Sequence, residues 1–306
     1  MTERKNKPGI AKYVRLIVLG LFGLGLTITM LLQGTDVALL NPSGFIAGQQ
    51  RSLMFFSVII LLAVAVPTLI MLYFFAWKYR ESNTKAAYDP GVRHGKLFVF
   101  SMWAVPSFFM LVLALVMWTA THKLEHNKPI ASATKPITIQ VVAMRWKWLF
   151  IYPEQNIATV NFVQIPVDTP IQFELTADET PMSSFWIPHF GGQLYAMTGH
   201  SNRLNLMAEE PGDYPGSTAE INGSGFAGMK FIARVTTEQD FDLWVQEMRG
   251  SSEVLDTAEY NNLLKPSENN PAAYYSSTES TLFDNLLMKY NGAHNHQPQN
   301  SGGNEQ

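Results

Sequence analysis

The sequence predicts a membrane-anchored α+β protein, in which a transmembrane helical hairpin precedes an extramembrane β-sandwich and short C-terminal helices. Three observations predict this fold class. Two long stretches, residues 52–77 and 97–121, contain no charged side chain. Short segments with alternating apolar and polar residues follow them, separated by Gly and Pro turns. From Thr237 onward, the apolar residues take helical spacing instead.

Composition limits the classes of function. The 306 residues suffice for a membrane anchor and one domain, and only 15% of them are charged, against about a quarter in soluble domains. A net charge of -3, without a basic stripe away from the membrane flanks, argues against a nucleic-acid partner. The absence of cysteine excludes disulfides, thiolate metal sites, a cysteine nucleophile and a lipid-modified cysteine.

Residues 1–34 form either a cleaved signal peptide or a retained signal anchor. Basic residues precede an apolar run at 16–32, which is 17 residues long and so at the short end for a membrane span. The residues after the run make a poor cleavage site: Leu32, Gln33, Gly34 and Thr35. We therefore favour retention, which would add an N-terminal span to the hairpin.

Residues 35–122 are expected to form the hairpin, with spans at about 52–77 and 97–121. At about 1.5 Å per helical residue, either span crosses a hydrocarbon core of about 30 Å. Each span contains one proline, Pro67 or Pro106, where we expect a kink.

The basic residues predict the orientation of this hairpin. Only Arg51 stands just before the first of the two spans, whereas the loop between them carries Lys78, Arg80, Lys85, Arg93 and Lys96. By the positive-inside rule this loop, at 78–96, is cytoplasmic. Everything after about Lys123 then lies on the opposite side of the membrane.

A polar linker at 123–136 leads to a domain expected over 137–236. Its first strand would begin at Ile137, and four aromatic residues two apart would share one face of a strand: Trp146, Trp148, Phe150 and Tyr152. Such a band of aromatic side chains is typical of interfacial anchoring or of core packing. A docking face for a membrane partner or an electron donor is the third interpretation.

Alternating patterns predict further strands, and Gly, Pro, Asn and Asp mark the bends between them. These segments are 158–165, 171–176, 203–208 and 229–235. Many short strands with such turns indicate a β-sandwich of about 100 residues.

A helical segment is expected over 237–291. Thr237 and Asp240 form a capping signal, a second short helix should begin near Asp256, and a third should end before Gly292. We expect these helices to pack on the sandwich or on a partner. The polar residues 292–306 predict a disordered tail.

Candidate catalytic and metal-binding residues are few. Four histidines flank the spans or lie in the tail, where exposure is expected: His94, His122, His294 and His296. His189 and His200 lie 11 residues apart with Met197 between them, a set that could hold copper, but a blue-copper site needs a thiolate. We therefore predict no metal site.

No catalytic motif is present either. The sequence has no Ser-His-Asp ordering, glycine-rich phosphate loop or zincin motif. The carboxylates near the loops are interpreted as a solvated rim: Asp178, Glu179, Glu209 and Glu210. The residues alone thus predict a non-catalytic β-domain on a helical hairpin.

Four segments carry a resemblance to a known family: 38–53, 144–162, 183–199 and 223–231. Together they resemble subunit II of the haem-copper respiratory oxidases, and in detail its quinol-oxidising, cytochrome bo-type branch. The resemblance implies a cupredoxin-like sandwich in the bacterial periplasm and a multi-pass anchor in the inner membrane. It also implies a proton-pumping ubiquinol oxidase in which subunit I holds the haems, copper B and the ubiquinol, with further small membrane subunits as partners.

In the cytochrome c oxidase branch of this family, the same domain binds a binuclear copper centre. The resemblance places Ser183 at the first histidine ligand, Glu220 and Ser224 at the two cysteines, Gly228 at the second histidine and Phe231 at the methionine. Every side-chain ligand is therefore replaced, as expected where electrons come from a membrane-dissolved donor. Within this chain the resemblance thus implies no catalytic, cofactor-binding or metal-binding residue.

Two positions depart from the pattern of the family. Thr35 stands where many quinol-oxidase members have a lipidated cysteine, and Val99 stands near the place of a glutamate associated with proton uptake. Lipidation is therefore excluded, and a carboxylate contribution to proton entry is in doubt. Two alternatives stay open: a cytochrome c oxidase subunit, which the missing ligands disfavour, and a free-standing membrane-anchored binding or assembly module.

Overall fold

The computed structural model describes residues 37–84, 91, 95–180 and 182–294, together with Gly20, Gly23, Gly25 and Thr27. The chain divides into two compact units, Met1–Asn41 and Pro42–Gln306. The expected span at 16–32 lies almost wholly outside the described residues, and the tail from 295 onward lies outside them altogether. Everything described below belongs to the second unit.

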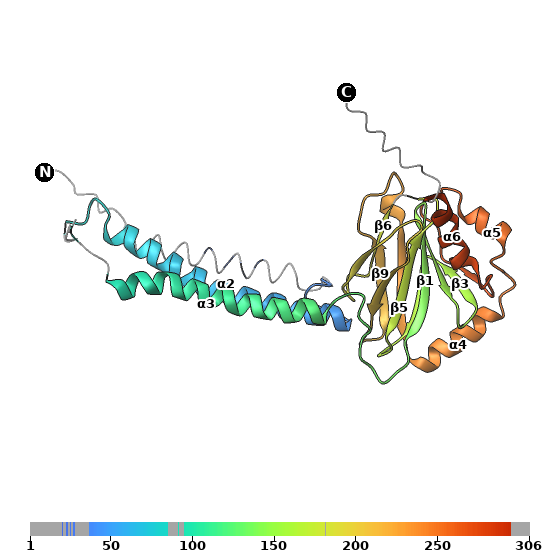
Figure 1. Cartoon of the computed structure of the whole chain (residues 1–306), viewed down its shortest axis with the longest axis horizontal. Helices are drawn as coiled ribbons and strands as arrows, with labels where there is room; N and C mark the ends of the chain where they lie inside the picture. Colours follow the sequence, from blue (N-terminus) through green and yellow to red (C-terminus); the bar gives the residue numbers. More distant parts are fainter. Residues whose placement is uncertain are drawn as a thin grey trace, which may run out of the picture. The chain divides into compact units, whose positions relative to one another are not determined.

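Two antiparallel helices form the expected hairpin (Figure 1): α2 spans Phe45–Lys78 and α3 spans Lys96–Lys123. Both are long and apolar enough to cross a membrane, and both proline positions lie inside them. Helix α2 begins seven residues before the expected span, because its first turn is hydrogen-bonded to the β-domain. There, the Phe45 and Ala47 amides donate to the carbonyls of Met207 and Phe190.

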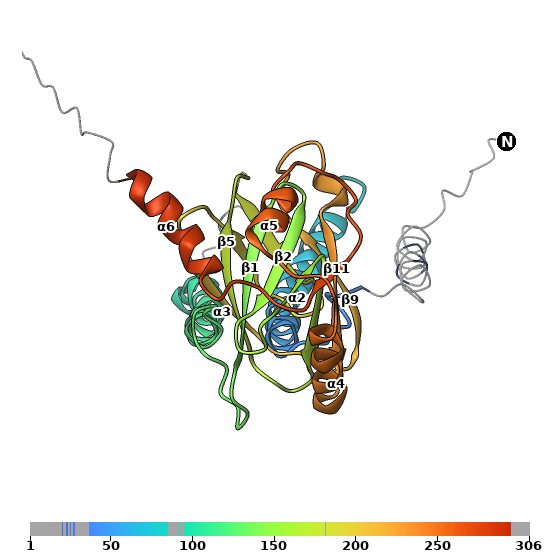
Figure 2. The same cartoon turned by 90° about the vertical axis from the view of Figure 1, so that its right-hand side faces the viewer.

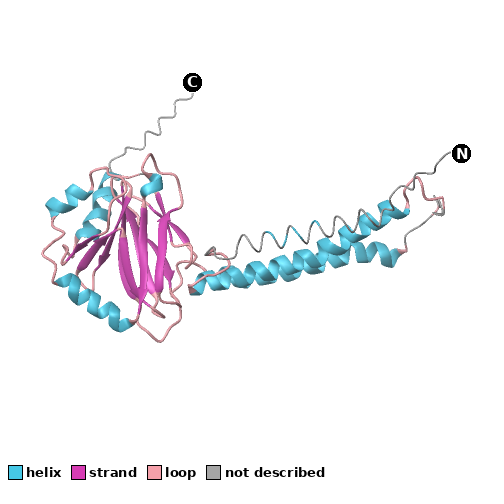
Figure 3. Ribbon diagram, turned by 180° about the vertical axis from the view of Figure 1, so that it is seen from behind, coloured by secondary structure: helices cyan, strands magenta, loops and turns pink. Residues whose placement is uncertain are grey.

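The β-domain is a two-layer sandwich (Figure 3), in agreement with the predicted fold class. In sheet order, the first layer has six strands: β11 (Ala273–Tyr275), β3 (Ile157–Val160), β2 (Lys147–Tyr152), β1 (Ile137–Met144), β5 (Ile171–Ala177) and β8 (Asn202–Leu206). The second has five: β4 (Phe162–Pro166), β10 (Lys230–Thr236), β9 (Gly212–Thr218), β6 (Ser183–Trp186) and β7 (Gln193–Ala196). A short helix, η1 (Phe226–Gly228), precedes β10. The pairs β1–β5 and β4–β10 are parallel, and the other pairs are antiparallel.

The aromatic residues of β2 form the centre of the main core. Trp148, Phe150 and Tyr152 are fully buried between the two sheets, so core packing is the correct one of the three interpretations. Interfacial anchoring and a docking face, the two other interpretations, are therefore wrong for Trp148. Trp146 lies outside the strand, in the tight turn between β1 and β2, where its φ is 63°. It is only partly buried and packs against the main core from that turn.

The expected strand at 158–165 is two strands in different sheets. The chain crosses from one sheet to the other at Asn161, whose φ is 52°. Its side-chain oxygen accepts from the Trp148 amide at 2.9 Å, and its side-chain nitrogen donates to the Asn270 carbonyl at 3.0 Å. Asparagine tolerates this left-handed backbone better than most residues, and its amide satisfies groups that the crossing leaves unpaired.

Three helices follow the sandwich: α4 (Glu238–Arg249), α5 (Thr257–Leu263) and α6 (Leu282–His294). The predicted caps are present, since Thr237 Oγ1 accepts from the Asp240 amide at 3.2 Å and Asp256 Oδ1 accepts from the Glu259 amide at 2.8 Å. Helix α6 continues past Gly292, because a glycine inside a helix costs only roughly 1 kcal/mol and is a weak stop signal.

Helices α5 and α6 lie on the outer side of the six-stranded sheet (Figure 2), where they help to build a second core, separate from the one between the sheets. Helix α4 packs into the main core instead, through its buried residues Phe241, Trp244 and Val245. The centre of the second core combines outward-facing residues of β1 to β3 with residues of the C-terminal segment, among them Leu149, Ile151, Tyr260, Phe283 and Leu286. The C-terminal segment therefore packs on the sandwich, one of the two expected outcomes.

Candidate functional site

The positions that match the copper ligands of the family lie at the start of β6, in the loop from β9 to β10 and at the start of β10. Ser183 is fully buried, and the side-chain nitrogen of Asn222 donates to its hydroxyl at 2.8 Å. The same nitrogen lies 3.1 Å from the sulfur of Met229. An amide side chain thus closes the space between β6 and the loop.

Phe231 belongs to the main core instead of facing a metal. Its ring stacks on that of Phe185, with centroids 5.1 Å apart and planes at 9°. Gly216 on the neighbouring strand leaves room for it, since a Cβ there would lie 2.1 Å from the tip of the Phe231 ring. This position therefore cannot present a ligand to the loop.

The other loop positions are covered by the segment that follows α5. The Ser224 hydroxyl donates to Glu268 Oε1 at 3.1 Å. A Cβ at Gly228 would lie 2.6 Å from Asn269 Oδ1, so no larger residue fits there without a shift. Glu220 is partly buried. The C-terminal segment therefore occupies the surface from which a histidine at position 228 would have to project.

Trp146 covers the same loop from the side of β2. Its indole lies so close to Gly225 that a Cβ there would be 2.3 Å from the ring. Arg145 Nε donates to the Glu179 carbonyl at 2.8 Å, and Lys147 Nζ donates to the carbonyls of residues 263 and 265 at 2.7 and 2.9 Å. Burial lowers the pKa of Lys147. Both residues that flank Trp146 are thus anchored, which holds the turn over the loop.

The histidines do not form a metal centre in the part of the chain that the structure describes. No three His, Cys, Asp or Glu side chains there lie close enough to hold a metal ion. His189 is buried against Tyr214, and its carbonyl accepts from the amides of Ser43 and Gly44, whereas His200 is exposed. His122 lies at the end of α3; His94 and His296 lie outside the described residues, as does the side chain of His294.

One of the four carboxylates that were expected to lie in a solvated rim is buried instead. Asp178, directly after β5, is 0% exposed. Its carboxylate accepts from the hydroxyls of Tyr260 and Tyr290 at 2.7 and 2.6 Å, and it pairs with Lys289 at 2.8 Å. The interpretation of Asp178 as a rim residue is wrong, because helices α5 and α6 bring it three partners from 82 to 112 residues away.

The electrostatics of this cluster follow from burial and from the carboxylate. Burial, and then the Asp178 charge, raise the pKa of Tyr260. Burial and the hydrogen bond to Asp178 likewise raise the pKa of Tyr290. Burial alone would lower the pKa of Lys289, but the hydrogen bond and charge of Asp178 raise it. The cluster therefore fastens the C-terminal helices to the end of β5, next to the carbonyl that Arg145 binds.

Comparison with known proteins agrees with this arrangement. Residues 152–236 match the family described as "Cytochrome C oxidase subunit II, periplasmic domain", and residues 249–294 match the "COX Aromatic Rich Motif". The second match covers the segment that builds the second core and supplies all three partners of Asp178. The fold and the loop thus define a subunit II of the respiratory oxidase class, with a cupredoxin-like domain.

Similar proteins identify the branch. The chain is 44% identical over 269 residues to cytochrome bo(3) ubiquinol oxidase subunit 2 of Pseudomonas putida, which covers 88% of this chain and 85% of the relative. It is 42% identical over 269 residues to ubiquinol oxidase subunit 2 of Acetobacter aceti, which covers 87% of each. This chain belongs to the ubiquinol oxidase subunit 2 family and is thus a subunit of an oxidoreductase complex.

Proposed function

We propose that this chain is the non-catalytic subunit II of a proton-pumping oxidase that oxidises ubiquinol and reduces oxygen to water in an aerobic respiratory chain. Subunit I holds the haems and copper B and handles the ubiquinol, and further small membrane subunits complete the complex. The present chain supports subunit I through its spans and caps it on the periplasmic side. It contributes no catalytic, cofactor-binding or metal-binding side chain.

The packing of the former ligand loop is the observation that supports this proposal. A binuclear copper centre needs bridging thiolates, which a chain without cysteine cannot supply. The loop is also filled by protein: Phe231 lies in the core, Asn222 closes on Ser183, and Asn269 abuts Gly228. This packing supports the proposal that electrons do not pass through the domain.

The proposed location is the bacterial inner membrane, with a multi-pass anchor and a periplasmic C-terminal domain. Helices α2 and α3 support it by length and composition, and the basic loop between them supports the orientation. Along the chain, we propose a signal anchor at 1–34, the hairpin at 35–122, a linker at 123–136, the cupredoxin-like domain at 137–236, a helical segment at 237–291 and a tail at 292–306.

Variants of the covering residues test whether the domain carries electrons. Trp146→Phe and Ser224→Ala each alter the cover of the loop without removing a core side chain. We expect ubiquinol-dependent oxygen uptake per haem to be unchanged in the purified complex. The recovery of haem with the tagged chain serves as the control for assembly. A large loss of turnover in a fully assembled complex would contradict a non-catalytic role.

A further inference from the structure

The hairpin is attached to the sandwich at two places, one on each helix (Figure 1). Before α2, Gly44 forms an antiparallel bridge with Ala208, which follows β8. Just past α3, the His126 carbonyl accepts from the amide and the side chain of Asn205 in β8, at 3.2 and 3.1 Å. We call these two attachments together the joint.

Backbone hydrogen bonds form the attachment on α2. The amides of Ser43 and Gly44 donate to the His189 carbonyl at 3.0 and 3.1 Å. In the other direction, the Glu209 amide donates to the Ser43 carbonyl at 2.8 Å. Ser43 is buried in this contact. The chain that leads into the hairpin is therefore bonded to the sandwich in the manner of a short strand.

The sandwich also supplies the N-terminal cap of α2. Gly44 stands at the N-cap position, and it has no side chain to accept from the first amides of the helix. Instead, the Phe45 amide donates to the Met207 carbonyl at 3.0 Å. The Ala47 amide donates to the Phe190 carbonyl at 3.1 Å. The first turn of this helix is thus completed by residues that come much later in the chain.

Glycine makes the close approach of the two backbones possible. A Cβ at Gly44 would lie 2.6 Å from the Cα of Phe190. The φ of Gly44 is -125°, which any residue adopts, so the contact with Phe190 is what requires glycine here. On the opposite side, a Cβ at Gly191 would lie 3.0 Å from the Ala47 nitrogen. The backbones of the hairpin and the sandwich are therefore in direct contact.

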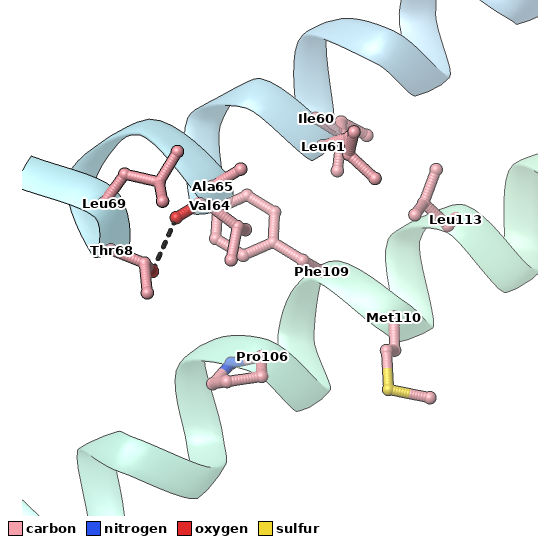
Figure 4. Close-up of a pocket in the computed structure, with 10 residues that line it drawn as sticks. All are labelled: Ile60, Leu61, Val64, Ala65, Thr68, Leu69, Pro106, Phe109, Met110 and Leu113. Atoms are coloured by element: carbon pink, nitrogen blue, oxygen red, sulfur yellow. Dashed lines mark hydrogen bonds between the residues drawn. The ribbon is translucent and has the colours of Figure 1, made fainter. Parts of the chain in front are cut away.

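Packing between the two helices contributes less to holding their ends. A pocket of about 480 Å³ lies beside both attachments, and its lining includes Ile46, His126 and Asn205. Further along the hairpin, α2 and α3 enclose an apolar pocket of about 530 Å³ (Figure 4), with Phe109 directed toward α2. Because side chains leave these spaces open, the placement of the sandwich on the hairpin depends on the backbone bonds of the joint.

We propose that the joint makes the hairpin and the sandwich one rigid body, and that Gly44 is required for it. Domains that are connected by linkers alone move relative to each other. Here, attachments on two different helices fix rotation as well as distance, whereas a single attachment would leave the sandwich free to turn. Exposed side chains change rotamer rapidly, but backbone groups do not, so the coupling is stiff. The sandwich is thereby held at one position relative to the membrane.

Distances between spin labels test this rigidity on the full-length chain in detergent micelles. The chain contains no cysteine, so introduced cysteines are the only labelling sites. Four exposed positions serve: Ser52 on α2, Thr119 on α3, Lys230 on β10 and Asp242 on α4. The pairs 52/230 and 119/230 cross the joint, and the pair 230/242 lies within the sandwich. We expect all three distance distributions to be equally narrow. Broad distributions for the two pairs that cross the joint would overturn the proposal.

Gly44→Ala should loosen the joint. Gly48→Ala, one turn further along α2, is the matched control, because the nearest atom to its Cβ would be 4.0 Å away. Gly44→Ala should broaden or shift both distances that cross the joint and leave the distance within the sandwich unchanged. Gly48→Ala should leave all three unchanged. Distributions for Gly44→Ala that superimpose on those of the wild type would contradict the role of Gly44.

Hydrogen exchange tests the joint without any substitution. The first amides of a helix ordinarily exchange fast, because they have no partner within the helix. In the wild-type chain, peptides that cover 43–47 should instead be protected as strongly as those that cover β5. Fast exchange across 43–47, as at a frayed helix end, would overturn the proposal even if the Gly44→Ala variant does not fold.

Discussion

At the scale of single residues, Asp178 is expected to have a large effect on stability. Replacing it with asparagine keeps the shape but removes the charge that accepts two tyrosine hydroxyls and pairs with Lys289. We expect Asp178→Asn to lower the free energy of unfolding by about 2–4 kcal/mol, because charge-assisted hydrogen bonds to a buried group are lost. Thermal or denaturant unfolding of the purified chain measures this. Asp213→Asn is the control, since its pair with Arg234 is half-exposed and worth about 1 kcal/mol or less.

Gly228 is the second residue with a specific prediction. A methyl group at this position must displace Asn269, so Gly228→Ala should destabilise the domain by about 1–3 kcal/mol. Gly48→Ala is the matched control, because its nearest neighbour would be 4.0 Å away. Equal unfolding midpoints for the two variants would show that the C-terminal segment does not press on the loop.

At the scale of elements, α6 tests whether the second core holds the C-terminal segment. Phe283 is 2% exposed and Met288 is 69% exposed on this one helix. Phe283→Ala should cost about 3–5 kcal/mol and speed proteolytic cleavage after β11, because it leaves a cavity under the helix. Met288→Ala should leave both measurements unchanged. If the two variants behave alike, α6 is not docked as described.

The helices and strands also show which parts of the fold local sequence patterns can predict. Strands β5, β8 and β10 and the capped starts of α4 and α5 could be predicted, because each depends on local alternation or on a local cap. Strands β6 and β9 could not be predicted in this way, because β6 has only four residues and β9 contains Gly212, Pro215 and Gly216. These two strands form through pairing with strands that are distant in the sequence, and a local pattern contains no information about that pairing.

The candidate site also has a part that the sequence predicts and a part that it does not. The replaced ligand positions could be predicted from the resemblance to a family, because cysteine and histidine are identified by residue type alone. The burial of Asp178 could not be predicted, because its partners lie far away in the chain. The clustering of tyrosines after Asp256 is the one available signal. It becomes informative only once the fold brings those tyrosines to β5.

At the scale of the whole molecule, the cluster at Asp178 predicts sensitivity to alkaline pH. The pKa values of Tyr260, Tyr290 and Lys289 are raised in the folded chain. Groups of this kind stabilise the fold fully below their unfolded pKa values, about 10 for Tyr and 10.4 for Lys, and lose that contribution as the pH rises through the folded values. The unfolding midpoint should therefore fall from about pH 10 upward.

A pair of tyrosine variants checks the source of that fall. Tyr290→Phe removes one of the three groups and should make the decline with pH shallower. Tyr195→Phe should keep the wild-type slope, since Tyr195 is exposed on β7. Identical slopes for both variants would show that the alkaline transition arises elsewhere in the molecule.

The central claim for the whole molecule is that its periplasmic domain caps a quinol oxidase and accepts no electrons. The most direct test is oxygen uptake by the complex that copurifies with the tagged chain, supplied separately with reduced ubiquinol and with reduced cytochrome c. We expect haem in the eluate and oxygen uptake with ubiquinol alone. Uptake driven by reduced cytochrome c would contradict the account, because a route for electrons would then have to pass through this domain.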